Sequence, residues 1–198
     1  MSIKAEKSQQ MFLRARDSID LSDILIPNIP FESSIKLLGV TFDSKLSYNS
    51  HVYNVTKKAS SKLYVLRQLK PFLPFDGLIQ VYNNCIRSIL EYCAPVLVST
   101  GAANTMALER IQKRSHKIIC GDSDCLCGNF IPLNYRRAII GFNMFSSLIE
   151  DSDHPLHHLT PRRLRYSKKF CVPVCKSALR SNSYIVSMIR LYNSGFAC

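Results

Sequence analysis

Four cations in the middle of the chain have the residue types and the spacing best suited to binding an anionic ligand: Arg110, Lys113, Arg114 and Lys117. They stand at i, i+3, i+4 and i+7, which places them on one face of a helix, away from the apolar positions of the same segment. Like charges on one ridge repel each other slightly unless anions neutralise them. The spacing therefore favours contact with phosphates, and the alternative is a helix face that is only solvated.

Two further groups of cations indicate a phosphate-binding surface less clearly. Lys57, Lys58, Lys62 and Arg67 lie on three different sides of an earlier predicted helix. The run Arg162-Arg163-Leu164-Arg165-Tyr166-Ser167-Lys168-Lys169 mixes cations with one aromatic side chain. It is compatible with a grip on a phosphate backbone, with a nuclear-import signal or with an unstructured basic extension. The sequence does not separate these three.

Cysteine and histidine raise the question of a zinc site. The candidates are Cys120, Cys125, Cys127, Cys171, Cys175, His154, His157 and His158. Structural zinc sites use paired ligands such as Cys-x2-Cys and His-x3-5-His. The cysteine spacings here are x4, x and x3, without a conforming second pair, so reduced thiols, mostly buried, are the favoured interpretation and no metal ligand is predicted.

Signatures of common enzyme classes are absent from the sequence. It contains no Gly-rich phosphate loop, no Gly-x-Ser-x-Gly and no His-Glu-x-x-His. Asp122 and Asp124 have no third carboxylate nearby, so hydrated loop acids are expected there. No catalytic residue is predicted.

The overall charge agrees with a polyanionic partner. The chain has 198 residues and a net charge of +12. Residues 51–119 hold ten Lys or Arg against three acids, and residues 159–198 hold eight against none. Such basic segments point to RNA or DNA. No apolar run approaches the ~20 residues of a membrane span, and no signal peptide is apparent. We therefore expect an intracellular protein of the nucleus or cytoplasm, not secreted and without a membrane partner.

Hydrophobic periodicity predicts the elements that position these residues. Short strands are expected at 10–13, 23–26 and 35–42, with Leu38, Val40 and Phe42 on one face. A helix is expected over 49–70 and another from residue 74. The predicted buried stripe of this second helix is Leu78, Val81, Cys85, Ile89 and Tyr92. A third helix follows Gly101 and ends at Gly121, and two more cover 135–150 and 184–192.

Several motifs resemble reverse transcriptases of non-LTR (LINE-like, jockey-type) retrotransposons. The blocks that carry the resemblance are Ala5-Glu6-Lys7-Ser8-Gln9-Gln10-Met11-Phe12-Leu13; Lys36-Leu37-Leu38-Gly39-Val40-Thr41-Phe42-Asp43; Tyr82, Arg87, Leu90, Glu91, Tyr92 and Pro95; Leu108-Glu109-Arg110-Ile111-Gln112-Lys113-Arg114; Arg136-Arg137; and Ile189-Arg190-Leu191-Tyr192-Asn193-Ser194. The resemblance covers about residues 5–195. It implies an α+β, mainly α fold, with short antiparallel strands, a three-helix thumb-like bundle and a helical C-terminal extension.

The same resemblance implies three parts and a function. Residues 1–46 would be the end of the palm, 47–121 the three-helix thumb, and 122–198 a helical connector with a basic extension. The chain would be a fragment of an RNA-directed DNA polymerase whose thumb binds RNA, DNA or their hybrid, sequence-nonspecifically. The predicted nucleic-acid-binding residues are Lys57, Lys58, Lys62, Arg110, Lys113, Arg114 and Lys117.

Departures from the family pattern bear on activity. The family polymerises with two Mg²⁺ ions held by palm aspartates, including a Phe/Tyr-Ala-Asp-Asp turn that this sequence lacks. We therefore expect the chain alone to be inactive and to contain no cofactor, with the missing palm as a further candidate partner. The competing hypotheses are a protein–protein interaction module whose basic tail binds an acidic partner, and a degenerate element product without function.

Overall fold

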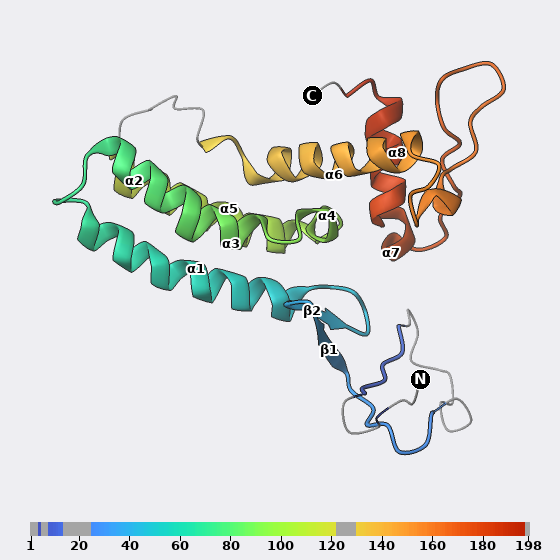
Figure 1. The fold of residues 1–198 in the computed structure, drawn as a ribbon, viewed down its shortest axis with the longest axis horizontal. Helices are drawn as coiled ribbons and strands as arrows, with labels where there is room; N and C mark the ends of the chain where they lie inside the picture. Colours follow the sequence, from blue (N-terminus) through green and yellow to red (C-terminus); the bar gives the residue numbers. More distant parts are fainter. Residues whose placement is uncertain (1–3, 5–7, 14–24, 122–129, 197–198) are drawn as a thin grey trace. The chain divides into compact units, whose positions relative to one another are not determined.

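The structure is a computed structural model that describes residues 4, 8–13, 25–121 and 130–196 (Figure 1). In these ranges it is mainly helical, with one two-stranded antiparallel sheet. This confirms the predicted α+β, mainly α class. The contacts divide the chain into two units, residues 1–54 and 55–198, which are described separately.

The first unit contains a β-hairpin. Strand β1 (Ser34–Leu37) pairs with strand β2 (Val40–Asp43), and Leu37 lies opposite Val40. The two connecting residues, Leu38 and Gly39, have φ angles of 47° and 84°. Positive φ at both positions is what a two-residue hairpin turn needs to match the twist of its strands.

The hairpin corrects the single strand predicted for 35–42. Alternation of apolar residues indicated that Leu38, Val40 and Phe42 share one face. Instead the chain reverses at Leu38, whose side chain is 82% exposed, whereas Val40 is buried. Gly39 provided the signal for this turn, because glycine adopts positive φ without steric cost.

Gln10 holds the segment before the hairpin without forming a strand. Its backbone N–H donates to the Pro30 carbonyl at 3.0 Å, and the Glu32 N–H donates to its carbonyl at 2.9 Å. The Gln10 side chain also donates to the carbonyls of Ile26 and Ile29. The strands expected at 10–13 and 23–26 are therefore not formed by the described residues, and residues 23 and 24 lie outside them.

Asp43 fixes the connection between the hairpin and the first helix. Its carboxylate accepts hydrogen bonds from the backbone N–H groups of Ser47 (3.1 Å) and Tyr48 (2.9 Å). Burial acts to raise the pKa of Asp43, but these hydrogen bonds and one from the Ser47 hydroxyl outweigh it, and the pKa falls below its ordinary value of 3.8. The folded state therefore favours the ionised carboxylate.

This carboxylate predicts a pH dependence of stability. A carboxyl group with a lowered pKa in the folded state contributes stability above pH 3.8, and loses it as the pH falls through the folded value. Asp43→Asn is expected to lower the free energy of unfolding at neutral pH by about 1 kcal/mol and to weaken the acid dependence. Urea unfolding at several pH values measures both, with the exposed Asp153→Asn as control. An equal acid dependence in wild type and Asp43→Asn would contradict the assignment.

Helix α1 (Asn49–Leu69) agrees with the predicted helix over 49–70. Its buried apolar side chains recur every three or four residues, as the amphipathic pattern requires. They are Val52, Val55, Ala59, Leu63 and Leu66.

The second helical segment is interrupted by a π-helical turn. It consists of α2 (Phe75–Tyr82), the π turn Asn83–Arg87 and α3 (Ser88–Glu91). Through this wider π turn, the side chains that face the core recur every four residues. The buried side chains are Leu78, Ile79, Tyr82, Ile86 and Leu90. The predicted stripe was therefore wrong by one position for most of its length, and Cys85 and Tyr92 are exposed.

The remaining helices of the second unit form the rest of its core. Short α4 (Ala94–Leu97) precedes α5 (Ala102–Cys120), which ends at Gly121 with φ 72°. Helix α6 (Leu133–Glu150) contacts α4, α5 and α8 (Tyr184–Asn193). A 3₁₀ turn at His157–Leu159 and short α7 (Ala178–Ser181) lie between α6 and α8.

Helices α6 and α8 approach closely at a glycine. A Cβ at Gly141 would lie 3.2 Å from Met188 Sδ, and the Tyr184 hydroxyl donates to the Gly141 carbonyl at 2.7 Å. Phe145 and Phe170 complete this apolar cluster. The helices predicted over 135–150 and 184–192 are confirmed.

Candidate nucleic-acid interface

Helix α5 separates its cations from its core side chains. Arg110, Lys113, Arg114 and Lys117 are all exposed. The buried side chains of α5 occupy the opposite side of the helix. They are Leu108, Ile111, Gln112, Ser115, Ile118 and Ile119. We call the four cations the α5 ridge, and its geometry is the one expected from the spacing.

Few acids oppose these cations. Lys57, Lys58 and Lys62 are also exposed, along α1. Arg110, Lys113 and Arg114 form no ion pair within the described part of the chain, and the same holds for the three α1 lysines. Their charges therefore face solvent and are open to an anion.

Two cations that the sequence did not assign to a site join the ridge at one end. Arg67 and Lys70, from the end of α1, line an open depression together with Arg114, Lys117 and Ile118 of α5. Its volume is about 290 Å³. Sequence spacing could not reveal this cluster, because it depends on where the ends of two helices meet. We call it the basic depression.

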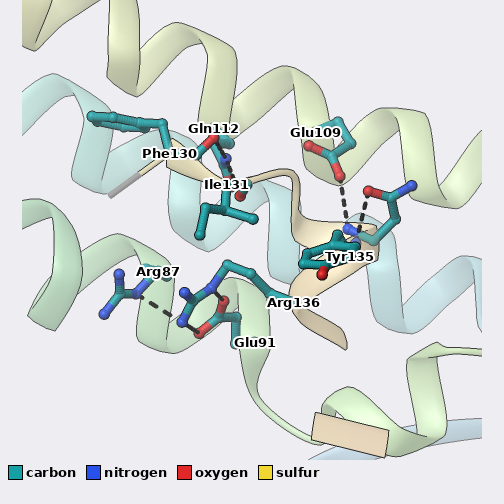
Figure 2. A network of polar contacts seen from close by, with 9 residues as sticks. Arg87, Glu91, Glu109, Gln112, Phe130, Ile131, Tyr135 and Arg136 are labelled. Atoms are coloured by element: carbon teal, nitrogen blue, oxygen red, sulfur yellow. Dashed lines mark hydrogen bonds and ion pairs between the residues drawn. The ribbon is translucent and has the colours of Figure 1, made fainter. Parts of the chain in front are cut away.

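The acids near α5 are engaged elsewhere. Figure 2 shows Glu91 of α3 between Arg87 and Arg136. Arg87 lies 3.7 Å from the Glu91 carboxylate, and Arg136 of α6 donates to both of its oxygens. The hydrogen bond from Arg136 to Glu91 raises the pKa of the arginine. Glu91 therefore links α3 to α6.

Glu109 and Gln112 link α5 to the start of α6 (Figure 2). Glu109 accepts a hydrogen bond from the Asn134 N–H at 2.9 Å. The Gln112 amide donates to the carbonyls of Phe130 (3.0 Å) and Ile131 (2.8 Å). These contacts turn the polar side chains of the Leu-Glu-Arg-Ile-Gln motif toward α6, whereas its cations remain on the ridge.

Arg137 is a buried cation that stands out in the sequence only as part of the Arg136-Arg137 motif. It is among the largest fully buried side chains, and its Nε and Nη2 atoms have no hydrogen-bond partner within the described ranges. Burial lowers the pKa of Arg137, while the negative charges of Glu109 and Glu91 act in the opposite sense.

Tyr82 is also buried, which raises its pKa, and its ring stacks on Phe130 at 4.7 Å.

The basic run near the C-terminus is a closed loop rather than an unstructured extension. The Leu164 N–H donates to the Lys169 carbonyl, and the Cys171 N–H donates to the Arg162 carbonyl. Buried Phe170 anchors the loop, because its N–H and carbonyl both bond the Asn193 side chain at 2.9 Å. Residues 162–169 are all exposed. We call this segment the basic loop.

The histidine and cysteine candidates do not assemble into a site in the part of the chain that is described. His154, His157 and His158 each use Nδ1 in a contact with the backbone of a nearby residue. Cys125 and Cys127 lie outside the described residues. The expectation of mostly buried thiols is wrong for the cysteines that are described there, since Cys85 and Cys171 are exposed and Cys93, Cys120 and Cys175 are only partly buried. Within the described ranges, no three His, Cys, Asp or Glu residues gather where they could hold a metal ion.

Among the described residues, no helix has both the length and the apolar character needed to cross a membrane.

No family model, no curated protein and no solved structure matches this chain.

Proposed function

We propose that this chain is the C-terminal part of a non-LTR retrotransposon reverse transcriptase, and that it binds the backbone of RNA, DNA or an RNA–DNA hybrid. Binding would be sequence-nonspecific and would use the α5 ridge with Lys57, Lys58 and Lys62. The proposal assigns the chain no catalytic residue and gives a metal no role in it.

The observation that carries this proposal is the α5 ridge. Its four cations are exposed on the side of α5 opposite the core, and no acid within the described ranges pairs with Arg110, Lys113 or Arg114. Phosphates of a nucleic-acid backbone would relieve the repulsion along such a ridge and release counterions.

The thumb-like assignment belongs to the same proposal. Helix α1, the α2–α3 segment and α5 would be the three thumb helices, and the β1–β2 hairpin the end of the palm. Its support is that Glu91, Glu109, Gln112 and Arg136, which come from three separate motif blocks, meet in one polar network. Because these residues hold neighbouring helices together, their contacts give a physical reason for the motif blocks to occur in the same chain.

The test is a salt series. We expect the purified chain to bind a short labelled RNA–DNA hybrid with a dissociation constant of roughly 10⁻⁴–10⁻⁶ M near physiological salt. Four phosphate contacts predict a slope of about −3 to −4 in a plot of log association constant against log salt concentration. Fluorescence anisotropy measures both quantities. Absence of binding at low salt, by a chain whose circular dichroism is helical, would refute the proposal.

A second candidate function rests on the basic loop. Five cations stand on an exposed loop that Phe170 and Asn193 hold in place. Such a surface fits an acidic protein partner. This alternative predicts partner-selective binding with little affinity for bare RNA or DNA, so the same salt series separates the two functions.

A further inference from the structure

The basic depression differs from the rest of the α5 ridge in its shape and lining. Arg67 of α1 and Lys70, which directly follows α1, line it together with Arg114, Lys117 and Ile118 of α5. The surface inside the depression is mostly carbon, contributed by Ile118 and the side-chain stems of these cations. A charged rim around an apolar floor suits a ligand that has both phosphates and a flat apolar face.

An exposed phenylalanine stands directly beyond this cluster in the chain. Phe72 follows Lys70 by two residues, and its side chain is 81% exposed. The turn that carries it is ordered, because the N–H groups of Phe72 and Leu73 both donate to the Leu69 carbonyl, at 3.0 and 3.1 Å. Prolines on either side, Pro71 and Pro74, restrict the backbone further. The ring is therefore presented to solvent by a rigid segment.

Resting on the proposed function, we infer that the basic depression and Phe72 bind unpaired nucleotides of a single strand. The rim cations would contact consecutive phosphates, one base would lie on the apolar floor, and a neighbouring base would stack on Phe72. Aromatic side chains beside a positively charged groove are the usual means of holding single strands without sequence preference.

The apolar elements favour a single strand over a duplex. Inside a duplex the faces of the bases are covered by their stacked neighbours, so neither Phe72 nor the floor of the depression can reach them. Phosphates are accessible in both forms. The α5 ridge thus suffices for duplex binding, whereas the depression with Phe72 adds affinity only where bases are unpaired.

The experiment compares two probes on the full chain: a short labelled oligoadenylate, and the same strand paired with oligothymidylate in a blunt hybrid. Phe72→Ala is expected to weaken binding of the single strand by about fivefold or more and binding of the hybrid by less than about twofold. Tyr64→Ala is the matched control, because this aromatic is on α1, is 65% exposed and does not line the depression. It should change neither affinity.

A second variant tests the rim. Arg67→Ala with Lys70→Ala is expected to reduce the salt slope for the single strand by about 1.4, which corresponds to two phosphate contacts. Lys36→Ala with Lys45→Ala, two exposed lysines of the hairpin region, removes the same charge at another place. This control should leave the slope nearly unchanged.

The outcomes separate this inference from the proposed function. If wild type binds the hybrid but Phe72→Ala binds the single strand as wild type does, the inference is wrong and the proposed function stands. Equal losses for both probes would also overturn it. A folded wild type that binds neither probe overturns both. Displacement of the single strand by polyglutamate at matched charge, with Phe72→Ala equally displaced, would assign the depression to an acidic protein and reject the inference.

Discussion

Charge reversal of the α5 ridge is expected to abolish hybrid binding. In the variant Arg110, Lys113, Arg114 and Lys117 all become Glu, and affinity should fall by roughly 100-fold or more, because four favourable phosphate contacts become repulsive. All four side chains are exposed on the side of α5 away from the core, so the fold should tolerate the change. Fluorescence anisotropy at constant salt measures the loss, and far-UV circular dichroism checks the helices.

The control for this variant keeps the net charge equal. Reversing Lys36, Lys45, Lys176 and Arg180, which are exposed and lie outside the ridge, also lowers the net charge from +12 to +4. If attraction to the whole protein were responsible for binding, the two variants would lose affinity equally. We expect the control to retain most of the affinity. Unchanged hybrid binding by the ridge variant would contradict the proposed function.

Removal of Glu91 is expected to be the most destabilising change of a polar residue. Its carboxylate pairs with Arg87 and Arg136, and its side chain is only 15% exposed. Glu91→Ala leaves a half-buried arginine without its partner and removes a negative charge that acts on buried Arg137. We expect the free energy of unfolding to fall by about 2–4 kcal/mol. Urea unfolding followed by circular dichroism measures it.

A matched acid and a double-mutant cycle test this explanation. Glu150→Ala removes an exposed acid from the end of α6 and should change the stability by less than about 0.5 kcal/mol. In the cycle, Glu91→Ala and Arg136→Ala should show a coupling of at least about 1 kcal/mol. Additive effects of the two changes would mean that the contact between α3 and α6 contributes little to stability.

The sequence by itself determined the elements whose signals are local. The apolar periods of α1, α5 and α8 predicted these helices, and Gly121 predicted the end of α5. The same period placed the α5 ridge opposite the core. Such predictions succeed because helix geometry fixes which residues share a face, whatever the helix packs against.

Local signals failed where two structures fit one pattern. The alternation over 35–42 suits a single strand, yet positive φ at Leu38 and Gly39 reverses the chain there. The π turn Asn83–Arg87 lies inside a segment that reads as one ordinary helix, and across it the buried positions recur every four residues, at Tyr82, Ile86 and Leu90. In both places the backbone departs from the regular period that the prediction assumed.

Only the tertiary structure decided which distant residues meet. It placed Arg67 and Lys70 beside Arg114 and Lys117, and it joined Glu91 to Arg136 across 45 positions of the chain. It also closed the basic loop through Phe170 and Asn193. Side-chain spacing specifies the faces of a helix, but contacts between helices depend on how their apolar faces pack, and no period within one segment encodes that.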